Sequence, residues 1–334
     1  MDSRVLKSLT KRRALAVIGG LATSWLPIPY GHADSYPTRP IRLIIPYAPG
    51  GGTDTVGRAI AEEMSRSLGQ PIIVENRGGA NASIGSTVAA KANPDGYTIL
   101  YGTDANLVLN PLLYKNLTYD PQIDFVSIGL LAEVPQLIAI SPKINLQRIE
   151  DFIQYLRLHP GTLNYASAGR GGNGDLAAEM FMQEFSLNMQ PIAFNGSVPA
   201  LSAVLSGTVE VYFGTMAAVL PHIKASKLIP LAVLTPNRQV ALPEVPTVAE
   251  SGAPGFDATL RVGLVAHSKT PQSIVARLNE ALNAALDSPK LRHRLESAGF
   301  NVAQSGSPER FTEINARSRE IWTKVIQSRK ISLD

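Results

Sequence analysis

Two segments of the chain share one pattern, in which an apolar run is followed by a glycine-rich turn and then by helical periodicity. The first is "LIIPYAPGGGTD", Leu43 to Asp54, and the second is "YASAGRGGNGD", Tyr165 to Asp175. Glycine permits positive φ angles and lets another group approach the backbone closely. The helix that follows presents unpaired N–H groups and the positive end of its dipole, which favour an anion such as a carboxylate. Two such turns predict two halves of one binding site.

Apolar runs alternate with helical patterns along most of the chain. This alternation predicts an α/β protein with two parallel sheets covered by helices on both faces. The expected strands include "IRLII", "QPIIVEN", "YTILYG", "QLIAISP", "TLNYAS", "QPIAFNG", "VEVYF" and "LIPLAVL". A helix with apolar residues from Leu146 to Leu156 is expected to be capped by Asn145. "VGLVA" is expected to cross between two lobes, and the last helices to pack on the first lobe.

The N-terminal residues have the pattern of a secretory signal. Lys7, Lys11, Arg12 and Arg13 precede the apolar run "ALAVIGGLATSWL", and the small residues of "GHA" follow. We therefore expect residues 1–33 to be a signal peptide, cleaved after Ala33 on export to the periplasm. A membrane anchor is disfavoured because the apolar run is too short to span a bilayer. The adjacent arginines leave both the general and the twin-arginine export routes open.

Charge and cysteine content narrow the function classes. Five of the 31 basic residues and one of the 27 acidic residues lie within residues 1–33, so the remaining chain carries 26 of each. That balance removes the electrostatic case for nucleic acid or an anionic membrane as a partner. The chain has no cysteine. Disulfides, thiolate metal sites and cysteine nucleophiles are therefore excluded.

Motifs of catalysis are weak in this sequence. Ser167 in "YASAG" lacks the first glycine of a nucleophile elbow, and "GRGGNG" matches the dinucleotide-binding spacing only late in the chain. The histidines His159, His222, His267 and His293 are scattered without metal-ligand spacing. No metal, no cofactor and no catalytic residue is therefore predicted, and the paired turns indicate a binding protein.

Polar residues in and after the two glycine turns have alternative roles. Asp54 and Asp175 stand near the expected helix starts, where capping is the simpler interpretation and ligand contact the alternative. Thr53, Ser167 and Asn173 could add side-chain donors to a ligand.

Several longer segments resemble one known family. "YPTRPIRLIIPYAPGGGTDTVGRAIAEEMSRSLGQPIIVENRGGANASIGSTVAAKANPDGYTILYGT" is similar to the Bug-type extracytoplasmic solute-binding proteins of tripartite tricarboxylate transport systems. "NPLLY", "FNGSVPALSAVLSG" and "ALPEVPTVAESGAPGF" match in the same order. Together these segments cover nearly all of the chain after residue 33.

The resemblance implies a two-lobe, periplasmic-binding-protein fold (class II-like) with a ligand cleft between the lobes. Lobe 1 is expected to comprise residues 34–137 and 258–334, and lobe 2 residues 138–257. A monomeric receptor of this kind captures a small organic acid and delivers it to membrane permease subunits. A periplasmic sensor that feeds a two-component system is the alternative, and a periplasmic enzyme that uses the same cleft is a weaker one.

The resemblance also implies which residues bind the ligand. In the first lobe they are Tyr47, Ala48, Pro49, Gly50, Gly51, Gly52, Thr53 and Asp54. In the second lobe they are Ser167, Ala168, Gly169, Arg170, Gly171, Gly172, Asn173 and Asn195. Asn76 and Thr103 match positions near the cleft, where structural hydrogen bonding is an equally good interpretation.

The sequence departs from this family at four positions. Family members usually have histidine at Asp175, a basic residue at Asn195, aspartate at Gly214 and tryptophan near Arg261. Loss of a cation at Asn195 weakens the expectation of a dicarboxylate. Arg170 is expected either to replace that charge by pairing with a ligand carboxylate or to point into solvent.

Overall fold

The apolar run "IRLII" forms a strand next to the edge strand of a mixed sheet, where all its side chains except that of Arg42 are buried. We describe the protein from a computed structural model, which covers residues 36–194, 196–329 and 331–333. The first sheet has the strand order β11-β4-β10-β3-β1-β2. Its strands are β1 (Ile41–Ile45), β2 (Ile72–Asn76), β3 (Thr98–Thr103), β4 (Phe125–Val134), β10 (Leu260–His267) and β11 (Asn301–Val302).

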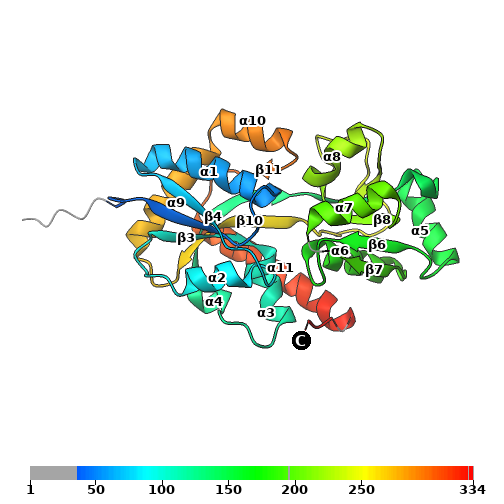
Figure 1. Ribbon diagram of the computed structural model, residues 1–334, viewed down its shortest axis with the longest axis horizontal. Coiled ribbons are helices and arrows are strands. Elements are labelled where there is room, and N and C mark those ends of the chain that lie inside the picture. The colour runs from blue at the N-terminus through cyan, green and yellow to red at the C-terminus, as the bar shows by residue number, and fades with distance from the viewer. Residues whose placement is uncertain (1–35, 195, 330, 334) are drawn as a thin grey trace, which may run out of the picture. The chain divides into compact units, whose positions relative to one another are not determined.

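Helices cover both faces of the first sheet (Figure 1). On one face, a Cβ at Gly129 of β4 would touch Leu282 of α9. On the other, a Cβ at Gly263 of β10 would overlap Phe311 of α11. The helices around this sheet are α1 (Gly52–Leu68), α2 (Ser83–Ala90), α3 (Asn110–Leu113), α4 (Pro121–Asp124), α9 (Gln272–Leu286), α10 (Pro289–Ser297) and α11 (Pro308–Arg329), with a short π-helical turn η1 (Ala105–Leu109).

The second sheet has the order β7-β6-β8-β5-β9. Its strands are β5 (Gln136–Ile140), β6 (Asn164–Ser167), β7 (Gln190–Ala193), β8 (Val211–Thr215) and β9 (Ile229–Val233). Alternate residues of β5 face different apolar clusters, since Leu137 and Ala139 belong to one and Ile138 and Ile140 to the other. The helices of this lobe are α5 (Ile149–Leu158), α6 (Asn173–Phe185), α7 (Ser197–Ser206) and α8 (Met216–Lys224), with a 3-10 turn η2 (Pro142–Ile144).

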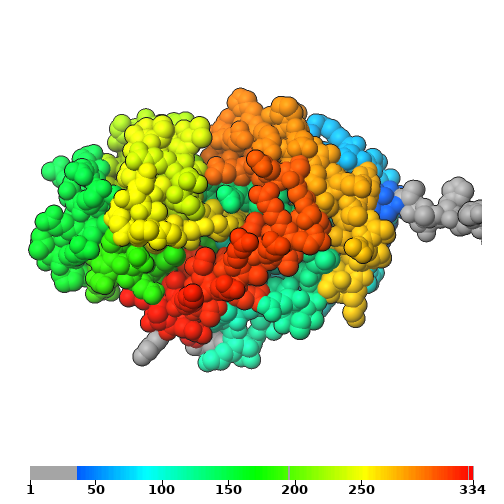
Figure 2. All heavy atoms as spheres, turned by 180° about the vertical axis from the view of Figure 1, so that it is seen from behind, coloured from blue at the N-terminus to red at the C-terminus, as the bar shows by residue number. Residues whose placement is uncertain are grey.

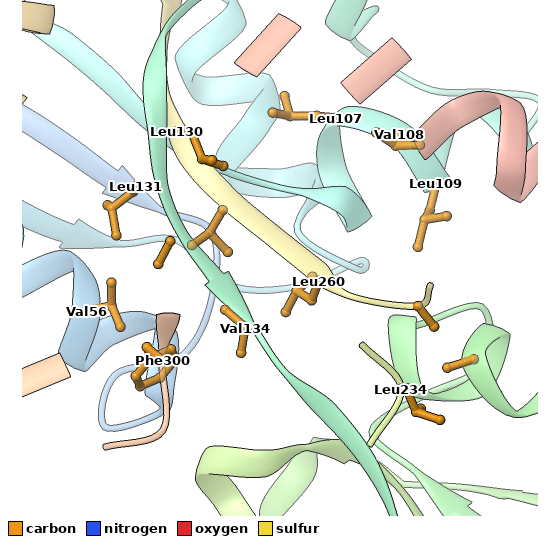
Figure 3. Close-up of a cluster of buried hydrophobic side chains, with 14 of the residues drawn as sticks. Val56, Leu107, Val108, Leu109, Leu130, Leu131, Val134, Leu234, Leu260 and Phe300 are labelled. Carbon is orange, nitrogen blue, oxygen red and sulfur yellow. The ribbon is translucent and has the colours of Figure 1, made fainter. Parts of the chain in front are cut away.

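Two chain segments connect the sheets. The first runs from β4 into β5 through Pro135, and the second leads from β9 to β10. They are hydrogen-bonded where they pass each other, because the Gln136 side chain donates to the Ala258 carbonyl oxygen at 2.7 Å. Figure 3 shows Val134 and Leu260, which are partners in the β4–β10 ladder, close together in the apolar cluster. The two lobes therefore share a continuous apolar core at their connection.

Helix α11 also joins the lobes. It packs against β4 of the first sheet and against α6 of the second lobe. Arg329 at its end donates to Glu179 of α6 at 2.7 Å. Figure 2 shows this helix in red along the back of the molecule, with its C-terminal end against the green helices of the second lobe.

Two details of the predicted fold are wrong. Both sheets are mixed, because β10 runs antiparallel to β3 and β4, and β5 runs antiparallel to β8 and β9. Apolar runs carry no information on direction, and these strands enter their sheets from the other lobe. Asn145 does not cap α5, since it has a left-handed φ of 56° after η2 and the helix begins at Ile149.

The expected signal peptide, residues 1–33, lies outside the residues that the structure describes. Among the helices that it does describe, none is both long enough and apolar enough to cross a bilayer.

Candidate functional site

The first glycine loop leads from β1 into α1. Gly50 has a φ of 86°, which a residue with a side chain adopts only with strain. Gly51, rather than an aspartate, occupies the N-cap position of α1, with a φ of −81° and a ψ of 174°. Gly52 faces the Phe300 ring, since a Cβ on this glycine would lie 3.3 Å from the ring carbon Cζ. Glycine is needed here for both the turn and the close packing.

Asp54 holds the first loop together. Its carboxylate accepts hydrogen bonds from the Gly50 N–H at 3.0 Å, from Arg58 Nε at 3.0 Å and from Asn76 Nδ2 at 2.9 Å. Asn76 Nδ2 also donates to the Tyr47 carbonyl oxygen at 3.1 Å. Burial alone would raise the pKa of Asp54, but the hydrogen bonds from Arg58, Gly50 and Asn76 outweigh burial and hold this pKa below its usual value. The carboxylate is therefore an ionised structural anchor.

Thr103 connects the first loop to β3. The Tyr47 hydroxyl lies 2.7 Å from Thr103 Oγ1, and the Thr103 N–H donates to Asn106 Oδ1 at 2.7 Å. Burial raises the pKa of Tyr47 to about 12, with the Thr103 hydrogen bond acting in the opposite direction. Asn76 and Thr103 both make hydrogen bonds within the protein, which is the structural one of the two roles considered for them.

The second loop repeats the geometry of the first. Gly171 has a φ of 67°, and its N–H donates to Asp175 Oδ2 at 2.9 Å. Asp175 stands four residues after the glycine, as Asp54 stands four residues after Gly50. The helix N-cap is Gly172. Our expectation that the two aspartates lie at the N-cap is thus wrong by three positions: each is the third helical residue and reaches back to the loop.

Asp175 is fully buried within a polar chain that runs through α6. Its Oδ1 accepts from the Tyr165 hydroxyl at 2.9 Å and from Arg170 Nη1 at 3.1 Å. Tyr165 also donates to Glu179 at 3.3 Å, and Glu179 pairs with Arg329. Burial raises the pKa of Asp175, while Gly171, Arg170 and Tyr165 oppose that effect. Sequence analysis missed Tyr165, Glu179 and Arg329 because only folding brings them together.

Arg170 does not simply point into solvent. Its guanidinium pairs with Asp175, although 43% of the side chain is exposed. It lines a hollow of about 340 Å³ together with Glu179, Ser328 and Arg329. The C-terminal residues reach the same region, because a Cβ on Gly171 would overlap Leu333 and Leu113. The second loop is therefore packed against α3 and the chain end.

The first turns of both helices leave backbone donors without partners. Within the described part of the chain, the N–H groups of Gly52, Thr53 and Asp54 have no acceptor, and neither do those of Asn173, Gly174 and Asp175. The Asn173 side chain adds another donor, because its buried Nδ2 has no hydrogen-bond partner. Unpaired donors at a helix N-terminus attract anions.

The predicted site residues form two groups in the structure. Tyr47, the Gly50–Asp54 segment, Asn76 and Thr103 are joined in the first lobe. In the second lobe, the Ser167 hydroxyl donates to the Gly169 carbonyl oxygen at 3.3 Å. The Gly196 N–H donates to the Ala168 carbonyl oxygen at 3.1 Å. Ala48, Pro49 and Arg170 are exposed, and Asn195 lies outside the described residues. For the residues that are described, no hydrogen bond joins the first loop to the second.

Phe300, which the sequence analysis missed, lies between the lobes. It faces Gly52, and a Cβ on the neighbouring Gly299 would lie 3.3 Å from Ala217 Cα in α8. Figure 3 shows its ring beside Val56 of α1. The segment Gly299–Phe300 thus bridges the start of α1 and the start of α8.

Asp104 is a second residue that sequence reasoning missed. It follows Thr103 and is fully buried. Its Oδ2 accepts from the Arg261 N–H at 3.2 Å, whereas Oδ1 has no partner among the described residues. Burial raises the pKa of Asp104 to about 7. The positive charge of Arg261 opposes this rise, and the negative charge of Asp257 adds to it. Arg261 itself pairs with Asp257 at 2.6 Å, beside the strands that connect the lobes.

Removal of the buried anchor in the second loop should be more costly than removal of its counterpart in the first. Asp175→Ala leaves the buried Gly171 N–H unpaired, so we expect a loss of about 2 kcal/mol in the free energy of unfolding. Asp54→Ala should cost about 1 kcal/mol, because water can reach Gly50 and Arg58. Urea unfolding at neutral pH measures both. Equal losses in the two variants would contradict this ranking.

The described residues of the site include no arrangement typical of metal binding. Among the residues that the structure describes, no three histidine or acidic side chains are placed to hold a metal ion. The chemistry that the two loops offer is hydrogen-bond donation to an anion.

Comparisons with known proteins agree with this geometry. A model of the tripartite tricarboxylate transporter family receptor matches residues 56–331. The BugT protein of Bordetella pertussis is 36% identical over 94% of this chain and 97% of its own length. A Rhodopseudomonas palustris protein solved with adipate is 31% identical, with a TM-score of 0.82 over 89% of this chain and 99% of that one. MatC from the same organism, solved with malate, is 32% identical. Its TM-score is 0.78, and the match covers 87% of this chain and 100% of that one.

Proposed function

This chain belongs to the tripartite tricarboxylate transporter receptor family, and we propose that it captures a small organic carboxylate between its two lobes for uptake by a membrane permease. Members of this family are solute-binding receptors. Relatives of similar fold were solved with adipate and with malate, both dicarboxylates. A carboxylate is therefore the class of ligand to test first.

The observation that carries this proposal is the pair of unsatisfied helix starts. Each lobe offers three first-turn N–H groups that have no acceptor among the described residues, and Asn173 adds a buried side-chain donor. An unpaired buried donor costs free energy, so a ligand that accepts from the Asn173 side chain gains affinity. A carboxylate has the lone pairs and the charge that suit a helix N-terminus.

The ligand contacts that we propose come from both loops. In lobe 1 they are Tyr47, Ala48, Pro49, Gly50, Gly51, Gly52, Thr53 and Asp54, with Asn76 and Thr103 behind them. In lobe 2 they are Ser167, Ala168, Gly169, Arg170, Gly171, Asn173 and Asn195. Because Asp54 and Asp175 already accept the N–H groups of Gly50 and Gly171, the donors of the following residues are the ones left for the ligand.

We propose lobe boundaries at residues 34–137 plus 258–334 and 138–257. The change of sheet between β4 and β5, and again between β9 and β10, supports a division close to these positions. Closure of the lobes on the ligand would then be a hinge motion about the two connections.

The proposed receptor is a periplasmic monomer without catalytic activity. We infer that the signal peptide is cleaved after Ala33, from the sequence pattern there. The Ser167 hydroxyl donates to its own loop, which supports a binding role for this residue rather than a nucleophilic one. Delivery to permease subunits is favoured over sensing, because the family is one of transport receptors.

The proposal is tested by identifying the ligand and measuring closure. Mass spectrometry on natively purified protein should detect a small organic acid, and a thermal-shift panel of mono- and dicarboxylates should give a selective increase in Tm. The same acid should compact the protein in small-angle X-ray scattering. A protein that binds an uncharged solute tightly and no carboxylate would overturn the proposal.

Asn173 provides a sharper test of the second lobe. Asn173→Ala removes a donor that has no protein partner, so we expect a roughly tenfold loss of affinity for the selected acid with unchanged stability. Isothermal titration calorimetry gives the affinity and thermal unfolding gives the stability. Asn188→Ala, which changes an exposed asparagine between α6 and β7, is the matched control. Equal affinity of the Asn173 variant and the wild type would remove Asn173 from the site.

A further inference from the structure

A hollow of about 610 Å³ is lined by the α3–α4 segment and by Arg319 of α11, and none of its described lining residues belongs to either glycine loop. Leu112, Leu117 and the rings of Tyr114 and Tyr119 contribute apolar surface to it. Lys115 and Arg319 contribute positive charge. In Figure 2 the teal segment that carries α3 and α4 runs along one side of α11. Hollows of this volume are large enough for a small organic ligand.

Arg319 is the unusual residue in this hollow. Its Nε is buried without a hydrogen-bond partner among the described residues, and Nη2 makes a long 3.4 Å contact with the Leu107 carbonyl oxygen. No carboxylate lies within 4.0 Å of its guanidinium in the described part of the chain. Burial lowers the pKa of Arg319, and Asp120 opposes this only partly. A partly buried guanidinium without a counter-ion is unfavourable in isolation.

Arg261 shows what a compensated arginine looks like in the same fold. It pairs with Asp257 at 2.6 Å and lies 3.8 Å from Glu133. Although burial would lower its pKa, these carboxylates raise it. The contrast indicates that the protein neutralises a buried guanidinium on the connecting strands but leaves Arg319 under-compensated.

We propose that this hollow is a second ligand site, separate from the one between the lobes, and that it takes a small carboxylate with a flat apolar body. The carboxylate would accept hydrogen bonds from Arg319, whose Nη1 also has no recorded partner within the described residues. The apolar body would lie against Tyr114, Tyr119 and Leu117. The single guanidinium of Arg319 suits a ligand with a single carboxylate group.

The probe for this site is 4-fluorobenzoate, titrated into the isotopically labelled full chain. We expect saturable amide shifts in residues 111–122 and in the middle of α11. Arg319→Gln should weaken this binding at least tenfold, whereas Arg317→Gln, which removes an exposed charge from the same helix, should leave it unchanged. The neutral analogue 4-fluorobenzamide should produce no shifts there.

A second variant, Asn173→Ala, distinguishes binding of the probe between the lobes from binding in the hollow. Asn173→Ala should weaken any shifts around the glycine loops and leave those in residues 111–122 intact. Arg319→Lys keeps the positive charge but lacks the guanidinium that can donate two hydrogen bonds to one carboxylate, so this variant should bind the probe several-fold more weakly than wild type. It tests the site even if Arg319→Gln folds poorly. Absence of shifts in residues 111–122, equal binding by the Arg319 variants and wild type, or equal binding of the benzamide would each overturn the second site.

Discussion

The wild-type protein is expected to lose stability relative to an Asp104→Asn variant as the pH rises from about 4 to about 7. Burial raises the pKa of Asp104 to about 7 in the folded protein, while the unfolded chain releases this proton near the usual carboxyl value. A group whose folded pKa is raised contributes full stability below its unfolded pKa and loses that contribution as the pH rises through the folded pKa. The variant does not titrate at this position.

The change in stability with pH is large because, between the two pKa values, unfolding releases one full proton from Asp104. Between the two pKa values the difference in unfolding free energy should change by about 1.4 kcal/mol per pH unit, and it should level off above about pH 7. The asparagine can still accept the Arg261 N–H, so the geometry is preserved. Urea unfolding of both proteins at several pH values measures the slope, with exposed Asp151→Asn as control. A pH-independent difference between wild type and Asp104→Asn would show that Asp104 does not titrate in this window.

Gly174→Ala is expected to destabilise the protein by about 3 kcal/mol and to abolish tight ligand binding. A Cβ at Gly174 would clash with the Phe213 carbonyl oxygen, and this backbone cannot move without disturbing β8. The start of α6 would have to shift, and with it the donors of Asn173 and the second loop. The effect on affinity should therefore exceed that of Asn173→Ala.

Gly51→Ala is the matched control for Gly174→Ala. Nothing lies within 4 Å of a Cβ at Gly51, and its φ of −81° suits any residue. Its stability should stay within about 0.5 kcal/mol of the wild type. Thermal unfolding measures both variants, and calorimetric titration compares ligand binding by the Gly174 variant with that by the wild type. A Gly174 variant as stable as the Gly51 variant would contradict the close packing of α6 on β8.

Much of the fold was predictable because strand and helix patterns are local. "IRLII" coincides with β1, "VEVYF" overlaps β8 with an offset of two residues, and a helix follows each glycine turn, although it begins three residues earlier than expected. The two-lobe α/β class is confirmed by the structural relatives. Strand direction was not predictable, since β5 and β10 enter their sheets from the opposite lobe. The direction of these two strands is therefore set by long-range topology and not by the local sequence pattern.

The candidate site was predictable only in part, for a similar reason. The loops and the two aspartates were identified, but their partners Arg58, Tyr165 and Arg329 were not. Arg58 was within reach of sequence reasoning, because it lies one helical turn after Asp54. Arg329 was not, since 150 residues separate it from Glu179.

The packing of Gly171 against Leu113 and Leu333 bears on how long a ligand stays bound. In the proposed closure, the lobes cannot separate around the second loop without detaching the end of the chain and the Arg329–Glu179 pair. Contacts that must break before the lobes part contribute to the barrier to release. Residence time in this receptor would then depend on its last residues, far in sequence from the donors that set its affinity.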